Sequence, residues 1–307
     1  MLRLLTDPSL VLWRRRAHMQ LGSIARWLRK DSRFWEGEHF TVAVEGPGSG
    51  KGRDVVFVHG LAASPECWEG AEEYIGPEIR SHFIHMRGFA GLAASGFRKP
   101  GDFLKPVADS LAGYIRLLKA GPVAVVGHSM GGIVSMILAR DHPDVVDRLM
   151  VVDVPAFFSV LINPFATAKS MAGLAEASRR NYFEKSKKAL EDDLRRGADK
   201  LVTDRATLER IVRWGVLSDR ATTADVMAEV MVTDLRPDLA KIQAPVDVVY
   251  AWDKAGHVTK MALEQTYAAS YAGLVSGRRL RIDHARHYVM FDQPEVFYTA
   301  VRDWLAR

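Results

Sequence analysis

The chain has 307 residues, 48% of them hydrophobic, so it is long enough to bury a sizeable core and to fold without a partner. Its single cysteine, Cys67, excludes an intramolecular disulfide framework, and no CxxC or CxxH spacing indicates a thiolate metal site. The net charge of +5 could indicate a nucleic-acid partner, but the distribution of that charge argues against one.

The positive charge is concentrated at the start of the chain. Residues 1–35 hold eight basic and two acidic residues, a net of +6, so the remainder carries about −1 (5 − 6). We therefore expect a basic N-terminal extension over residues 1–35 and no nucleic-acid partner. The extension lacks the apolar core of a signal peptide, and the chain nowhere runs about 18 apolar residues together. These features predict a soluble, cytoplasmic protein without stable membrane insertion.

Strand signals begin at residue 40. Short apolar runs at 40–46, 54–60 and 81–88 each end at a glycine, and apolar residues at helical spacing follow over 105–121. Later runs are uninterrupted and rich in branched residues, which is typical of strands buried on both faces of a parallel sheet. These later runs are 123–127, 148–154 and 245–252. The alternation of strands and helices predicts an α/β fold with one mainly parallel sheet flanked by helices.

The strand signal stops between residues 155 and 240. Charged and apolar residues follow each other there with the composition and spacing of helices. We interpret residues 155–240 as a helical cap inserted into an α/β core, whose first part is 36–154 and whose second part is 241–307.

The segment VGHSMGG places Ser129 between Gly127 and Gly131 in a G-x-S-x-G motif, with a buried strand before it and a helix after it. Small neighbours allow a sharp turn that presents the serine hydroxyl at the carboxyl edge of the sheet. The same glycines could serve only tight packing of helix on strand. The motif therefore needs partners before it indicates a nucleophile.

Candidate partners occur elsewhere in the chain. His287, in HARHYVMFDQ, could act as the base, and Asp253, which follows a buried strand in YAWDKAG, could orient that base. Gly60 ends another strand and lets the backbone approach closely. The N–H groups of Leu61 and Met130 could then stabilise an oxyanion.

These motifs resemble those of the α/β-hydrolase superfamily. The likeness extends over residues 40–307 and rests, in family order, on FVHGLAAS, MRGFAGLAAS, VGHSMGG, RLMVVDVP and RHYVMFDQPEVFYTAVRDWL. The resemblance implies that Ser129 is the nucleophile, Asp253 the acid and His287 the base. It also implies that Leu61 and Met130 provide the oxyanion hole.

Two positions depart from the family pattern. Arg286 stands where a glycine usually precedes the histidine, and Ala251 stands where a glycine is common after the acid-bearing strand. Both departures bear on the assignment of the acid more than on that of the base. Asp153 is the alternative acid, because it ends the strand at 148–154 and some members of the superfamily place their acid there; Asp253 is the preferred assignment.

Two histidine pairs could be imagined as a zinc site, His82 with His85 and His284 with His287. The segment at 81–88 reads as a strand, in which side chains three residues apart point to opposite faces. We therefore expect no metal, and no organic cofactor is implied.

The sequence thus predicts a serine hydrolase of the carboxylesterase type that acts on small-molecule esters with small to medium apolar acyl chains. Phe157, Phe158 and Phe165, at the start of the cap, are the candidate walls of the acyl pocket. Lactonases, carbon-carbon bond hydrolases and cofactor-free haloperoxidases of the same fold also keep the serine and are alternatives. A binding protein on a hydrolase scaffold is the non-enzyme alternative. The oligomeric state and the natural substrate are open.

Overall fold

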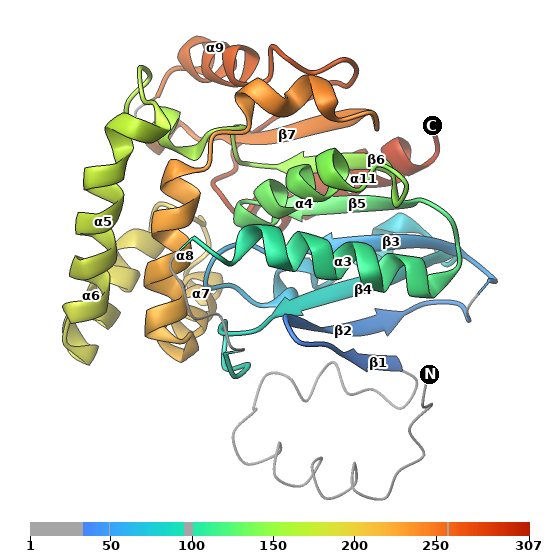
Figure 1. Cartoon of the computed structure of the whole chain (residues 1–307), viewed down its shortest axis with the longest axis horizontal. Coiled ribbons are helices and arrows are strands. Elements are labelled where there is room, and N and C mark those ends of the chain that lie inside the picture. Colours follow the sequence, from blue (N-terminus) through green and yellow to red (C-terminus); the bar gives the residue numbers. More distant parts are fainter. Residues whose placement is uncertain (1–32, 49, 95–100, 257) are drawn as a thin grey trace, which may run out of the picture.

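The computed structural model describes residues 33–48, 50–94, 101–256 and 258–307 (Figure 1). Its eight strands form one sheet in the order β1-β2-β4-β3-β5-β6-β7-β8. The first pairings, β1 with β2 and β2 with β4, are antiparallel, and all the others are parallel. The strands are β1 (Arg33–Glu36), β2 (Phe40–Glu45), β3 (Arg53–Val58), β4 (Ile79–Met86), β5 (Val123–His128), β6 (Val146–Val152), β7 (Val246–Trp252) and β8 (Arg279–Asp283). The predicted mainly parallel α/β sheet is confirmed.

The N-terminal extension predicted over residues 1–35 falls almost entirely outside the described residues. Its last residues, from Arg33, belong to the edge strand β1, which pairs with β2 through Arg33 opposite Val44 and Glu36 opposite Thr41. Within the described ranges, the helices are too short or too polar for any of them to span a lipid bilayer.

The strands are buried on both faces because alternate residues enter two separate apolar cores. In β3, Val56 and Val58 belong to one core, and Val55 and Phe57 belong to the other. Helices α3 (Leu104–Leu118), α4 (Met130–Asp141) and α9 (Lys260–Ser270) cover the first face (Figure 1). Helices α2 (Ala71–Ile75) and α11 (Pro294–Leu305) cover the second. Full burial of each such valine or phenylalanine contributes roughly 1.5–3 kcal/mol to the hydrophobic stabilisation.

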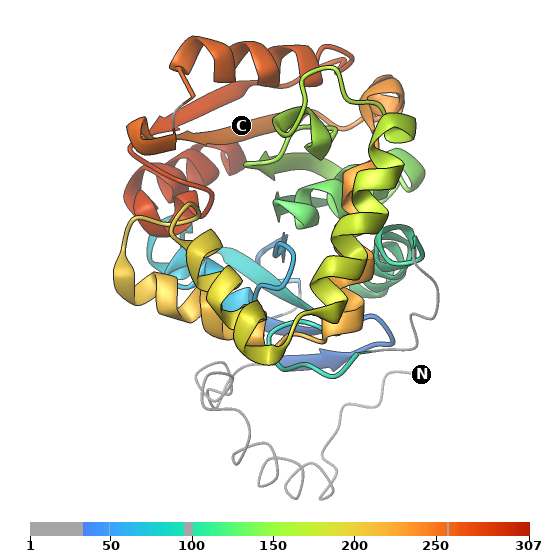
Figure 2. The same cartoon turned by 90° about the vertical axis from the view of Figure 1, so that its left-hand side faces the viewer.

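Between β6 and β7 the chain forms a layer of helices that stands at one end of the sheet, seen from the side in Figure 1 and end on in Figure 2. The layer consists of the 3-10 helix η3 (Phe158–Leu161) and the helices α5 (Ala168–Glu184), α6 (Lys187–Ala198), α7 (Arg205–Leu217) and α8 (Arg220–Val232). The 3-10 helix η4 (Arg236–Lys241) follows α8 and packs against α4. In this layer, α5 packs on α8 and α6 packs on α7. We call α5 to α8 and their connections the cap.

The cap is joined to the core by hydrogen bonds to elements far away in sequence. The N–H of Asp219 donates to the carbonyl of Gly88 at 2.7 Å. The carboxylate of Glu229, on α8, accepts the N–H groups of Phe103 and Leu104 at 3.0 Å each. Phe103 itself supplies no side-chain cap to α3, so Glu229 performs that role from the cap.

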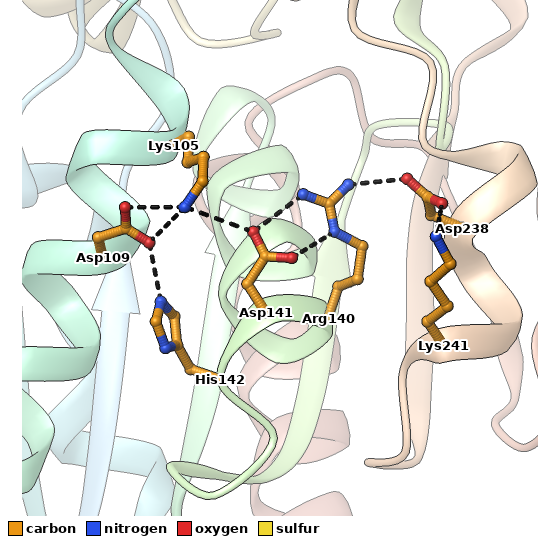
Figure 3. A network of polar contacts seen from close by, with 7 residues as sticks. All are labelled: Lys105, Asp109, Arg140, Asp141, His142, Asp238 and Lys241. Carbon is orange, nitrogen blue, oxygen red and sulfur yellow. Dashed lines mark hydrogen bonds and ion pairs between the residues drawn. The ribbon is translucent and has the colours of Figure 1, made fainter.

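A network of charged side chains joins α3, α4 and η4, and Figure 3 shows its seven residues. Lys105 contacts Asp109 one turn later and also Asp141, while Arg140 joins Asp141 to Asp238. The hydrogen bond from Arg140 holds the pKa of Asp141 below its usual value. The network fixes three elements on the side of the sheet that α3 and α4 cover.

Candidate active site

Ser129 lies at the turn between β5, which ends at His128, and α4, which begins at Met130. Its backbone has φ 55° and ψ −125°, a conformation that costs an L-residue on the order of 1–3 kcal/mol. The turn is held by the N–H of Ser129, which donates to the carbonyl of Val152 at 2.8 Å, and by the N–H of Gly132, which donates to the carbonyl of Ser129 at 2.8 Å. The serine is therefore held in strained geometry by its surroundings.

The two flanking glycines are required by close backbone contact. A Cβ at position 127 would lie 2.5 Å from the carbonyl oxygen of Gly131, and a Cβ at position 131 would lie 2.3 Å from the carbonyl oxygen of Val58. Tight packing and presentation of the hydroxyl are thus two results of the same turn.

His287 is hydrogen-bonded to Asp153. Its Nδ1 donates to Asp153 Oδ2 at 2.8 Å, which leaves the lone pair of Nε2 free to accept a proton. The other carboxylate oxygen, Asp153 Oδ1, accepts the N–H of Ala251 at 2.9 Å and the hydroxyl of Tyr267 at 3.3 Å. Asp153 therefore has a fixed orientation with one oxygen reserved for the imidazole.

This contact corrects the expected pairing of His287 with Asp253. Asp253 Oδ1 instead accepts the N–H of Ala255 at 2.8 Å and lies 3.6 Å from Nε of Arg286. Strand register explains the difference, because His128 is paired with Val152 and so Ser129 and Asp153 both follow the last paired residues of neighbouring strands. Strand β7 is one strand farther from the serine and runs on to Trp252, three residues beyond the partner of Val152, so Asp253 lies past the edge.

The loop that follows β3 lies directly against Ser129. A Cβ at Gly60 would be 3.0 Å from the Cβ of Ser129. His59 fixes this loop: its Nε2 accepts the N–H of Met86 at 3.0 Å, so its Nδ1 carries the proton and donates to the carbonyl of Gly60 at 2.7 Å. Burial lowers the pKa of His59 to about 3, which keeps the ring neutral.

The two expected oxyanion donors, the N–H groups of Leu61 and Met130, belong to this loop and to the serine turn. The amide of Leu61 belongs to the peptide unit whose carbonyl His59 holds. Met130 is the first residue of α4, and its amide is one of the helix N-terminal N–H groups that have no carbonyl partner one turn earlier. Such groups favour negative charge nearby.

His128 contacts His287 from the core side. Its Nε2 donates to the carbonyl of His287 at 2.9 Å, and the two rings lie with centroids 4.5 Å apart. Burial lowers the pKa of His128 well below its usual value, so this ring is neutral. His128 and Tyr267 thus hold the two partners His287 and Asp153 in place. The only signal for His128 in the sequence is its position next to the motif serine, and no signal indicates Tyr267.

The three phenylalanines differ in their surroundings. Phe157 is fully buried in the apolar core of the cap, with the guanidinium of Arg236 over its ring at 4.8 Å. Phe165 is 90% exposed, so its expected place in the wall of a closed pocket is corrected. Phe158 is half-buried and packs against both the main core and the cap core, and it stays a pocket candidate.

The side chains of three of the four histidines considered for zinc have other partners, among them His287, which is bonded to Asp153. His82 Nε2 contacts Asp54 at 2.7 Å, and His85 Nε2 donates to the carbonyl of Phe89 at 2.9 Å. The described part of the chain gathers no group of three or more side chains placed to hold a metal ion.

Comparison with known proteins adds to this geometry. A family model described as "Alpha/beta hydrolase family" matches residues 55–300. The chain is 24% identical over 262 residues to "(E)-2-((N-methylformamido)methylene)succinate hydrolase" of Acinetobacter baylyi, a match that covers 83% of this chain and 91% of that protein. It is 26% identical over 262 residues to "Pimeloyl-[acyl-carrier protein] methyl ester esterase" of Edwardsiella ictaluri, covering 83% and 93% respectively. The solved structure of the enol-lactonase from Burkholderia xenovorans LB400 has the same fold, with a TM-score of 0.70 at 19% identity, covering 90% of this chain and all of that one (100%).

Proposed function

This chain belongs to the alpha/beta hydrolase family, and we propose that it is a serine hydrolase of carboxylic esters. In this proposal Ser129 is the nucleophile, His287 the general base and Asp153 the acid that orients the base. The observation that carries it is the 2.8 Å hydrogen bond from His287 to Asp153, at the sheet edge where the strained Ser129 turn ends β5.

The reaction proceeds in two halves. His287 Nε2 takes the hydroxyl proton as Ser129 Oγ forms a bond to the acyl carbon, and the N–H groups of Leu61 and Met130 stabilise the negative oxygen that results. The bond to the alcohol then breaks, and the imidazolium returns its proton to the leaving oxygen. Water repeats both steps on the acyl-enzyme and releases the acid.

Asp153 favours this sequence by electrostatics and by tautomer control. Its carboxylate accepts Nδ1–H, which leaves Nε2 as the proton acceptor and stabilises the imidazolium after proton transfer. The hydrogen bonds from Ala251 and Tyr267 to its other oxygen prevent it from rotating away.

The proposed substrates are esters with small to medium apolar acyl chains. Half-buried Phe158, between core and cap, is the residue retained from the sequence as a pocket wall. Lactones are a second candidate class, because a lactone is an internal ester cleaved by the same steps and one structural neighbour is named an enol-lactonase. The named methyl ester esterase among the relatives supports the first class.

A fluorophosphonate probe tests the nucleophile. We expect covalent labelling of Ser129, no labelling of Ser129→Ala, and turnover of p-nitrophenyl esters that increases from acetyl toward butyryl or hexanoyl, because each buried methylene contributes up to about 0.8 kcal/mol. A lactone panel measured beside the esters separates the two substrate classes. Labelling at another residue, or full activity in Ser129→Ala, would contradict the assignment.

A further inference from the structure

The loop that carries His287 is fastened to the cap on both sides of that histidine. We propose that Arg286 and Asp292 latch this loop to the α6–α7 connection of the cap, residues 199–204, and thereby position the base for proton transfer. The inference rests on the proposed function of His287. It assigns Arg286, where the family usually has glycine, a positioning role.

Arg286 spans the gap between loop and cap with its side chain. Its Nη1 donates to the carbonyl of Asp199 at 2.5 Å and to that of Val202 at 3.1 Å. Its Nε lies 3.6 Å from Asp253, so the aspartate first expected to orient His287 instead faces the arginine beside it. One guanidinium can contact these two carbonyls and the carboxylate together, because its five N–H donors have a fixed planar geometry.

Asp292 closes the latch from the other end of the loop. Its Oδ2 accepts the N–H of Arg286 at 2.8 Å, and its Oδ1 accepts the N–H and the hydroxyl of Thr203 at 2.8 and 2.6 Å. The N–H of Tyr288 donates to the carbonyl of Leu201 at 2.9 Å. The residues directly before and after His287 are therefore both bonded to the same six-residue segment of the cap, residues 199–204.

This arrangement divides the support of the base between two parts of the molecule. The core holds the His287 ring through Asp153 and its carbonyl through His128. The cap holds the backbone through Arg286 and Tyr288. A displacement of the cap segment therefore moves Nε2 relative to Ser129, and a misplacement of about 1 Å can cost on the order of 100-fold in rate.

The test compares two arginines that both donate Nη1 to two carbonyls. Arg220 bonds the carbonyls of Lys185 and Phe183, so its bonds stay within the cap and it serves as the matched control. For Arg286→Ala we expect kcat to fall by about 10-fold or more with KM changed by less than about 3-fold, because positioning affects the chemical step. Millimolar guanidinium should restore part of the rate. Arg220→Ala should keep both constants within about 3-fold of the parent.

A second measurement does not depend on activity. Hydrogen exchange of the Tyr288 amide should become faster in Arg286→Ala and in Thr203→Val, which removes only the hydroxyl contact, but not in Arg220→Ala. Should Arg286→Ala fail to fold, Thr203→Val carries the same test with a smaller decrease in kcat.

Two results would overturn the latch: parent-like kcat and Tyr288 exchange in folded Arg286→Ala, or equal losses in Arg286→Ala and Arg220→Ala. Failure of the proposed function is distinct, because the parent protein itself would then not be labelled at Ser129.

Discussion

One carboxylate oxygen of Asp153 accepts two hydrogen bonds, and the other accepts the imidazole N–H of His287. Replacing a single oxygen of this carboxylate by an amide nitrogen should therefore change the protonation of His287. In Asp153→Asn, the amide oxygen stays with the N–H of Ala251 and the hydroxyl of Tyr267, so the amide NH2 must face His287. Nδ1 then accepts, Nε2 carries the proton, and the base is in the wrong tautomer. By analogy with the protease triad we expect kcat to fall by about 10⁴-fold with the fold unchanged.

Asp253→Asn is the matched control for that measurement, because it removes the same charge from the neighbouring strand. Its effect on kcat should be far smaller, since its carboxylate bonds its own turn and faces Arg286. Steady-state kinetics of the two variants on one ester decide between the aspartates. The reverse ranking would return the orienting role to Asp253.

The sequence predicted the positions of the serine and the histidine of the site, but not the aspartate that contacts the histidine. The G-x-S-x-G spacing identified a turn that the structure has at Ser129, and His287 lies in the contact expected of a base. The preference for Asp253 as the partner of His287 was wrong, since His287 contacts Asp153. Asp153 and Asp253 both follow buried strands, and the register of β6 and β7, which separates them, depends on pairing between distant segments.

Helix α3 shows how one element depends on another. Its first N–H groups are satisfied by Glu229 from α8, and no side chain of its own does so. Glu229→Ala should therefore lower the free energy of unfolding by about 1–3 kcal/mol, because two buried donors lose their acceptor. Urea denaturation followed by fluorescence measures this loss.

Glu229→Gln provides the graded comparison, since its single amide oxygen can serve only one of the two donors well. We expect an intermediate loss of stability and faster hydrogen exchange at Leu104 in both variants. Equal stability of Glu229→Ala and the parent would show that water replaces the carboxylate without cost.

The sequence predicted the positions of strands and helices better than it predicted which side chains are buried. Uninterrupted branched runs identified β5, β6 and β7, because strands buried on both faces need apolar residues at every position. The helical composition after β6 likewise matches α5 to α8. Phe157 and Phe165 look alike in the sequence, yet Phe157 is fully buried in the cap core and Phe165 is 90% exposed, because burial depends on packing against distant residues.

At the scale of the whole molecule, buried histidines with lowered pKa values should make stability depend on pH. Burial lowers the pKa of His59 to about 3, of His85 to about 4, and of His128 well below its usual value. Unfolding returns each to an ordinary pKa of about 6.5, so the unfolded state binds more protons below that pH. Stability from these groups is fully present above about pH 6.5 and is lost as the pH falls, toward about 4 for His85 and about 3 for His59.

His85→Gln isolates one of these contributions, because glutamine can still donate to the carbonyl of Phe89 but does not titrate. Between pH 6.5 and 4.5 the slope of unfolding free energy against pH should be smaller than in the parent by on the order of 1 kcal/mol per pH unit. Denaturation curves at five pH values measure both slopes. Identical slopes would mean that His85 does not titrate on unfolding.

The proposed site draws on residues that the chain makes at very different times. Asp153 and His287 are 134 residues apart, so at translation rates of about 5–20 residues per second the acid leaves the catalytic centre of the ribosome roughly 7–27 s before the base. A nascent chain that already contains the strained serine turn therefore has no base to activate it. Hydrolysis during synthesis would begin only after β7, β8 and the loop that carries His287 have docked on the earlier strands. The onset of hydrolysis would therefore mark the moment at which folding is complete.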